Sequence, residues 1–255
     1  MSLRLLAPVV TVVLVASCTS GGRPPSDDAT PADPPGTVAP STSPVVTPNP
    51  YASRSAAFRD RQLLGAARSG NAAKIDLLLE AGADVETRDD HQRTALLVAV
   101  THDRVEAARA LVAAGADPDA LDDRHDTPWL VTGVTGSVEM ARVVLDAGPD
   151  LTIRNRFGGL SHIPASERGH ADYVDFVLDH TGIAIEHVND LGWTALLEAV
   201  ILGRGTEPWQ RIVESLVEHG ADVSIADRDG VTPLQHARRL GHAEIADLLE
   251  RAPST

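Results

Sequence analysis

Ten histidines, one cysteine and 36 carboxylates are the side chains of this 255-residue sequence that could bind a metal or act in acid–base catalysis. Zinc sites and metalloprotease helices need ligands at fixed spacings, such as CxxC or HExxH, because the ligands share one metal centre. Neither pattern occurs, and the GxSxG elbow of serine hydrolases and the phosphate-binding P-loop are also missing from the sequence. The sequence therefore predicts a protein that is not an enzyme, with no catalytic residue, no metal site and no cofactor.

Two acidic pairs, Asp89-Asp90 and Asp122-Asp123, leave one alternative open. Both pairs fall in loops between apolar segments, where Asp is a common turn residue because its side chain hydrogen-bonds nearby backbone. A solvated turn is the simpler interpretation. A weak cation site in these loops is the alternative.

Cys18 is the one cysteine, and it follows an apolar run from Leu5 to Val15 that is too short to span a bilayer. The residues Val15-Ala16-Ser17-Cys18 resemble the lipobox of bacterial lipoproteins. That resemblance implies a signal peptide over residues 1–17 and lipidation of Cys18 at the new N-terminus. It also implies an anchor in the cell membrane, with the folded part on the extracytoplasmic face. An ordinary secretory signal with an incidental cysteine is the alternative.

Residues 18–54 begin with that cysteine and continue as a segment rich in Pro, Ser and Thr. The segment has very few large apolar residues, so it cannot bury a core and is expected to be disordered. As a flexible coil of this length it would reach about 35 Å. We interpret it as a tether between the membrane anchor and a folded domain over residues 55–255.

The formal charge of −14, from 22 basic and 36 acidic residues, limits the possible partners. Nucleic-acid binding depends on neutralising phosphates, which an acidic protein does poorly. The same excess of acid disfavours electrostatic adhesion to anionic lipid. We therefore expect a protein partner, no nucleic acid, contact with the membrane through the lipid anchor only, and a monomeric chain.

The elements that position these residues follow a repeat. Similar segments begin at residues 61, 94, 127, 160, 194 and 232, so that most intervals are 33 or 34 residues and the last is 38. Each unit reads as a short helix, a turn, a second helix and an extended loop, with Thr94 as an example of a helix N-cap. Self-similarity at this period is typical of a solenoid, which has no single buried active-site cavity.

The second helices share one apolar face. We counted back from the turn that ends each helix, at residues 82, 115, 148, 181, 220 and 252. The residues three, four and seven positions earlier are apolar in all six units. This spacing is typical of a helix that packs one face against its neighbours.

Several motifs identify the family that the repeat resembles. Thr127-Pro128, Thr232-Pro233-Leu234, Gly169-His170, Gly241-His242 and Gly-Ala-Asp at 82–84, 115–117 and 220–222 match the signature of the ankyrin repeat. The resemblance covers residues 57–252. It implies an all-α ankyrin-repeat solenoid of about six helix-turn-helix units with projecting β-hairpin loops. It also implies that His170 and His242 are structural and bond backbone in the adjacent turn.

Two units depart from this pattern. The fourth unit places Pro164 in its first helix, where a proline is tolerated within the first turn because those amides lack intrahelical partners. The fifth unit carries about four extra residues within 204–208, immediately before Trp209. A harmless insertion with Trp209 folded onto the protein is one interpretation, and a functional insertion is the other.

The resemblance to the ankyrin repeat implies that the loop tips and the exposed edges of the first helices line a concave groove, and the register of the repeat assigns residues to these positions. Phe157, Leu191 and Trp193 are apolar tip residues, and Ile201 and Leu202 fall on the same side. Aromatic residues rimmed by charged ones are typical of protein-binding hot spots. Trp193 could equally pack as structural filler. The predicted binding residues are Phe157, Leu191, Trp193, Ile201 and Leu202, with Arg156, Asp190 and Arg228 at the polar rim.

Two functions fit these observations. The first is a non-catalytic protein–protein interaction module tethered to the bacterial cell envelope. The second is an envelope accessory protein that supports a partner enzyme, as related exported ankyrin proteins are thought to do for antioxidant enzymes such as catalase.

Overall fold

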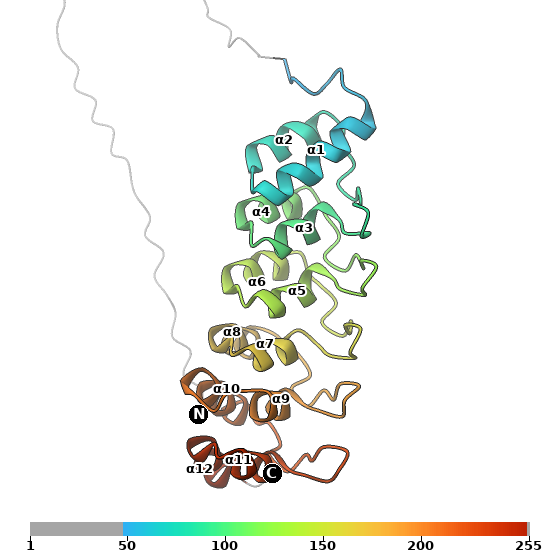
Figure 1. The fold of residues 1–255 in the computed structure, drawn as a ribbon. Helices are drawn as coiled ribbons and strands as arrows, with labels where there is room; N and C mark the ends of the chain where they lie inside the picture. The colour runs from blue at the N-terminus through green and yellow to red at the C-terminus, as the bar shows by residue number, and fades with distance from the viewer. Residues whose placement is uncertain (1–47, 254–255) are drawn as a thin grey trace, which may run out of the picture. The chain divides into compact units, whose positions relative to one another are not determined.

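A computed structural model describes residues 48–253, which fold into twelve α-helices arranged as six stacked pairs (Figure 1). Within this part of the chain the only β-type pairing is an isolated bridge between Arg88 and Thr94. The helices are α1 (Ala56–Ser69), α2 (Ala72–Glu80), α3 (Ala95–Thr101), α4 (Val105–Ala113), α5 (Pro128–Thr135), α6 (Val138–Leu145), α7 (His162–Arg168), α8 (Ala171–His180), α9 (Ala195–Ile201), α10 (Glu207–Glu218), α11 (Pro233–Leu240) and α12 (Ala243–Arg251).

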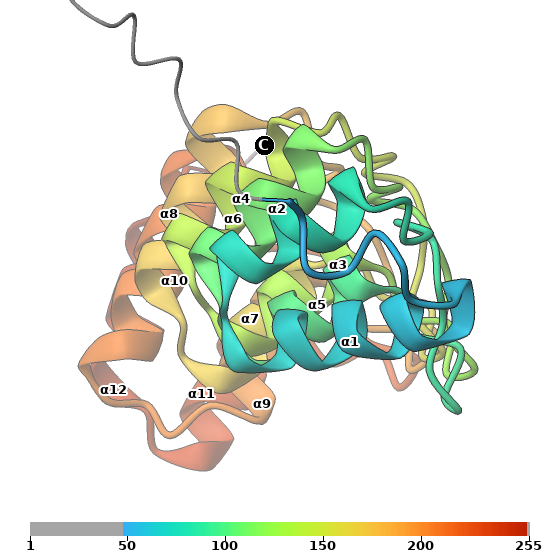
Figure 2. The same cartoon turned by 90° about the horizontal axis from the view of Figure 1, so that it is seen from above.

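The two helices of each pair form two rows. The odd-numbered helices lie in the row next to the long loops, and the even-numbered helices form the opposite row (Figures 1 and 2). The loops between pairs all project to the same side of the stack (Figure 1). This arrangement confirms the predicted all-α solenoid of six units.

The first helices of most units begin in the same way. Thr94, Thr127, Thr194 and Thr232 have extended backbone, and each side chain accepts a hydrogen bond from the amide three residues later, at 3.2 to 3.3 Å. Such a cap satisfies an amide that has no partner inside the helix and contributes about 1 kcal/mol. The predicted N-cap at Thr94 is confirmed.

The core lies between the two rows and continues from one unit to the next. The second helices bury the predicted face: the residue seven positions before each turn is fully buried. These residues are Ile75, Ala108, Ala141, Val174, Val213 and Ile245. Stacking neighbours is what buries this face, because a single helix pair is too small to cover its own apolar surface.

The fourth unit begins differently because Ser161 occupies the cap position. Its backbone is helical, with φ −57° and ψ −33°, and its side chain makes no cap hydrogen bond. Pro164 is the third residue of α7, so its missing amide would have had no partner inside the helix. The prediction that proline is tolerated there is confirmed.

The insertion in the fifth unit lies between α9 and α10, and Trp209 packs against unit four and against its own unit. Its Nε1 donates a hydrogen bond to the Glu167 backbone oxygen at 3.1 Å. Its ring covers Gly169 and Gly203, where an added Cβ would lie 3.0 Å and 2.5 Å from ring atoms. The interpretation of Trp209 as a packed residue is confirmed, although the ring covers the end of α7 and not an outer helix.

Two predicted features lie outside the described residues, namely the signal peptide over 1–17 and the lipidation site Cys18. The predicted tether over 18–54 overlaps the described chain only from Pro48 onwards. Of that overlap, Asn49 donates a side-chain hydrogen bond to the Leu77 backbone oxygen at 2.6 Å, and Tyr51 packs against the core. Among the helices described, none is both long and apolar enough to cross a membrane.

Candidate functional site

Five loop tips share one construction. In each, an Asp or Asn side chain accepts hydrogen bonds from the amides two and four residues later, at 2.8 to 3.1 Å. The residue three positions later has a positive φ. These tip residues are Asp89, Asp122, Asn155, Asn189 and Asp227, and we number the tips second to sixth by the unit whose first helix follows each of them. The construction explains the acidic pairs as turns, and no group of three potential metal ligands occurs in the part of the chain described.

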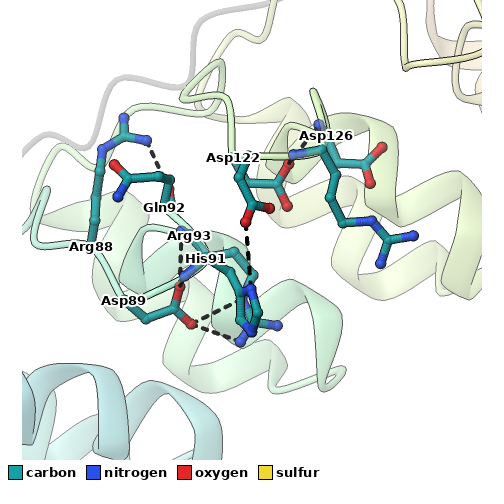
Figure 3. Close-up of polar contacts among 9 residues, drawn as sticks. Arg88, Asp89, His91, Gln92, Arg93, Asp122 and Asp126 are labelled. Carbon is teal, nitrogen blue, oxygen red and sulfur yellow. Dashed lines mark hydrogen bonds and ion pairs between the residues drawn. The ribbon is translucent and has the colours of Figure 1, made fainter.

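The second and third tips, built on Asp89 and Asp122, are linked to one another (Figure 3). Arg88 donates from Nη1 to the Gln92 backbone oxygen at 2.8 Å and to the Leu121 backbone oxygen at 2.6 Å. His91 lies 3.5 Å from the Asp123 carboxylate. Neighbouring tips therefore support each other, which gives the row a defined shape before any partner binds.

Within its own tip, Asp89 also holds Arg93, whose Nε and Nη2 donate to Oδ2 at 2.9 Å and 2.7 Å. Burial alone would raise the pKa of Asp89, but the hydrogen bonds from Arg93 and the tip amides lower it overall. Arg93 is thus committed inside the tip and is not a free cation.

A hollow of about 600 Å³ lies between the tips and the first helices of units two to four. We call it the first hollow. The first helices contribute the apolar side chains of its floor, which are Leu97, Val131, Val134 and Pro164, and most of the residues that the tips contribute to its wall are charged. Its lining residues are His91, Arg93, Leu97, Thr101, Asp122, Asp123, Arg124, Asp126, Val131, Val134, Asn155, Arg156, Phe157, Pro164, Glu167 and Arg168.

Phe157 and Arg156 dominate one wall of the first hollow. The Phe157 side chain is 54% exposed, and the Arg156 guanidinium lies 4.6 Å from its ring centroid. Arg156 also pairs with Asp126 at 3.0 Å. Burial raises the pKa of Asp126, and Arg156 opposes that rise. An exposed aromatic held by an arginine is the composition of a protein-binding hot spot.

A second hollow of about 580 Å³ continues from the first towards unit five. Its lining includes Leu202, Arg204 and Trp209, and it shares Val134, Glu167 and Arg168 with the first hollow. The two hollows therefore form one continuous strip across units two to five. We call this strip the groove.

The structure places the predicted binding residues in several locations. Arg156 and Phe157 line the first hollow, and Leu202 lines the second. The other predicted residues line neither hollow: Asp190, Leu191, Trp193, Ile201 and Arg228. The predicted cluster is thus not gathered into one depression, and the groove lies closer to the N-terminus than predicted.

The residues outside the hollows belong mainly to the fifth tip and its support. Leu191 is 51% exposed, whereas Trp193 is partly buried. The Asp190 amide donates to the Phe157 backbone oxygen at 2.9 Å, and Arg228 donates from Nη2 to the Asp190 backbone oxygen. Asp190 and Arg228 therefore connect neighbouring tips. Their role in binding stays a prediction.

Sequence reasoning missed the position of the groove because it searched for large exposed side chains. A hollow forms where side chains are short. In the phase of the repeat, Thr101 and Val134 stand where unit five has the longer Ile201. That difference in side-chain length was the signal available in the sequence.

Two histidines were expected to bond neighbouring turns, and they behave differently. His170 fulfils the prediction, because its Nε2 lies 3.2 Å from the Val134 backbone oxygen. For His242 the prediction is wrong. Its Nδ1 is buried without a hydrogen-bond partner, and its ring lies against Gly205. The His170 ring lies against Gly136 in the same way, so unit six keeps the contact between ring and glycine and lacks the hydrogen bond.

Unit five also buries an acid that the sequence did not reveal. The Glu198 side chain is 5% exposed and accepts a hydrogen bond from Asn189 Nδ2 at 2.7 Å. Burial raises the pKa of Glu198 to about 7, the nearby Glu167 adds to the rise, and Asn189 opposes it. Because Asn189 builds the fifth tip, this buried acid supports a loop next to the groove.

A second buried titratable group is His162 in α7. Burial lowers the pKa of His162 to about 4, His187 adds to the lowering, and the Ile185 backbone opposes it. This ring is therefore neutral at physiological pH. It is enclosed in the core between units and does not line the groove.

Comparison with known proteins agrees with this geometry. The family model described as ankyrin repeats in three copies matches residues 63–155 and 162–253. The ankyrin repeat protein YahD of Escherichia coli (strain K12) is 39% identical over 184 residues, which are 72% of this chain and 92% of YahD.

Solved structures show the same fold. A crystal structure of an ankyrin repeat domain from Acinetobacter baumannii AYE is 43% identical, with a TM-score of 0.72, and the match covers 76% of this chain and 98% of that one. The ankyrin repeat domain of Bcl-3, a member of the IkappaB protein family, is 26% identical, with a TM-score of 0.67, over 76% of this chain and 86% of that one. The chain therefore belongs to the ankyrin repeat family.

Proposed function

We propose that this protein is a non-catalytic interaction module that binds a protein partner in the groove. Ankyrin repeats mediate binding to protein partners, and the groove is the concave surface that this chain offers. The observation that carries the proposal is the exposed Phe157 beside Arg156, on the wall of a hollow with an apolar floor. A polar wall around an apolar floor excludes water from the central contacts, as in protein-binding hot spots.

We further propose that the module is attached to the extracytoplasmic face of the cell membrane by lipid on Cys18. The sequence Val15-Ala16-Ser17-Cys18 at the end of an apolar run supports this proposal. Several acyl chains on one cysteine would exceed the two signals that stable anchoring needs. The segment that follows is long enough to hold the groove away from the membrane surface.

Site-specific photocrosslinking in intact cells tests the groove. A photoreactive amino acid replaces Phe157 in the full chain, and a second version carries it at Leu240, which is also exposed but lies on α11 outside both hollows. We expect a discrete adduct with a protein from position 157 and none from position 240. Equal adducts from both positions, or none from position 157, would contradict the proposal.

Metabolic labelling with a clickable fatty acid tests the anchor. The wild-type chain should be labelled and recovered with membranes, whereas Cys18→Ser should lose the label because the acylated sulfur is gone. Equal labelling of the two proteins would show that Cys18 is not the lipidation site.

A further inference from the structure

Most carboxylates that line the groove already accept hydrogen bonds or lie against basic side chains within the protein. Asp122 accepts hydrogen bonds from the amides of Arg124 and Asp126 at 2.8 Å and 2.9 Å. Asp126 itself pairs with Arg156, and Asp123 lies beside His91. A partner that brought cations to these carboxylates would have to displace contacts that the protein already makes.

Glu167 is the remaining carboxylate of the groove. It stands close enough to the buried Glu198 to raise the pKa of that acid. Arg168, the next residue of the chain, also lines both hollows. Glu167 therefore does not by itself give this part of the groove a net negative charge.

Three exposed arginines of the groove form no ion pair in the described chain: Arg124, which lies near enough to Asp126 to lower the pKa of that carboxyl, and Arg168 and Arg204, which have no such carboxylate beside them. Arg168 lines both hollows and Arg204 lines the second. The Arg204 guanidinium lies 5.9 Å from the centroid of the Trp209 ring. On a protein of net charge −14, this is a local surface with free positive charge.

We propose that the groove recognises an acidic, extended segment of its protein partner. One apolar side chain of the segment rests on the floor formed by Val131, Val134 and Pro164, and carboxylates following it reach Arg168 and Arg204. Arginine suits this task because its planar guanidinium binds a carboxylate through two parallel hydrogen bonds. The inference rests on the proposed function, since it names the chemistry of the partner that the same groove binds.

The overall negative charge of the protein makes this recognition selective. An acidic segment is repelled at long range, so it gains affinity only when it reaches the two arginines and the apolar floor together. A basic segment is attracted at long range but would place its cations beside Arg168 and Arg204. The local positive charge of Arg168 and Arg204 therefore favours an acidic segment, whereas the net negative charge of the whole protein favours a basic one. The local contacts in the groove determine the affinity.

Selection of a displayed library of random twelve-residue peptides on the full chain tests the proposal. Enriched peptides are synthesised with a fluorescent label, and their affinity is measured by anisotropy. We expect enriched sequences to combine apolar residues with Asp or Glu. Arg168→Ala and Arg204→Ala should each weaken binding roughly tenfold, because each removes a charge-assisted contact. Arg239→Ala, an exposed arginine on α11 outside the groove, should bind as the wild type does.

A substitution on the apolar floor distinguishes the proposed preference for acidic segments from the proposed function of the groove, on which that preference rests. Val134→Arg should block the apolar floor while circular dichroism shows an unchanged helix content. If Val134→Arg abolishes binding but the arginine variants bind normally, or if the enriched peptides are basic, the acidic preference is overturned and the groove remains the binding site. If no peptide is enriched, or if Val134→Arg has no effect, the proposed function itself fails.

Discussion

The fifth and sixth loop tips each form a hydrogen bond with the first helix of their unit, but they use different side chains. In the sixth tip, Asp227 accepts a hydrogen bond from His236 Nε2 at 2.7 Å, nine residues further along. In the fifth tip, Asn189 and Glu198 stand in the same register and are also 2.7 Å apart, but here the tip residue is the donor. The backbone of the two tips is the same. Units two to four carry Val98, Val131 and Pro164 in this register, so this hydrogen bond is confined to units five and six, where the direction of donation is reversed.

The two pairs differ in how they respond to protons. Burial raises the pKa of Glu198 to about 7. The pKa of Asp227 is lowered, first by the hydrogen bond from the Val231 amide and then by His236. A group with a raised pKa contributes stability that is lost as the pH rises through that value, and a group with a lowered pKa contributes stability that is lost in acid. The fifth tip is thus weakened by base and the sixth by acid.

The largest expected effect is the pH dependence caused by Glu198. Its contribution is complete below its ordinary value of 4.5 and is lost as the pH rises through about 7. A shift of this size corresponds to about 3 kcal/mol in the free energy of unfolding. We expect Glu198→Gln to be more stable than the wild type at pH 8 and much closer to it at pH 5, measured by urea denaturation at both values.

The matched control for this experiment is Glu218→Gln, which removes an exposed carboxylate at the end of α10. It should follow the wild-type profile. A Glu198→Gln profile parallel to that of the wild type would show that Glu198 is ionised or neutral throughout the range and would remove the contrast between the tips.

A smaller effect is expected from removing the tip residue itself. Asn189→Ala deletes the acceptor for the Leu191 and Trp193 amides and leaves Glu198 buried without its partner. Together these losses should cost about 2 kcal/mol, because a buried polar group left without a partner retains its desolvation cost. Asp227→Ala should cost less, because His236 is closer to solvent and can bind water. Equal losses would mean that the burial of Glu198 does not distinguish the two tips.

The sequence predicted the features of this fold that repeat locally. The threonine caps and the apolar face of the second helices follow from spacing, because each depends on neighbours a fixed number of residues away. The role of His170 followed from the resemblance to the ankyrin repeat. The hydrogen-bonded pairs between tip and helix, Asn189 with Glu198 and Asp227 with His236, were not predicted. Glu198 and His236 are chemically unlike, and their equivalence depends on register and burial. The groove was missed because it depends on side-chain length, and the repeat pattern at Gly241-His242 does not show whether the ring finds a hydrogen-bond partner.

The last prediction exchanges the chemistry of the two tips. The double substitution Asn189→Asp with Glu198→His places the pair of the sixth tip in the fifth, where register and distance are the same. If unit five needs only a hydrogen bond at this position, the free energy of unfolding at pH 7 should stay within about 1 kcal/mol of the wild type, since the coupled changes compensate. The loss of stability from pH 5 to pH 8 should disappear with Glu198. A double variant as unstable as Asn189→Ala would show instead that the packing of units four and five accommodates only the amide of Asn189 and the carboxyl of Glu198. The side-chain pairs of the two tips would then not be interchangeable.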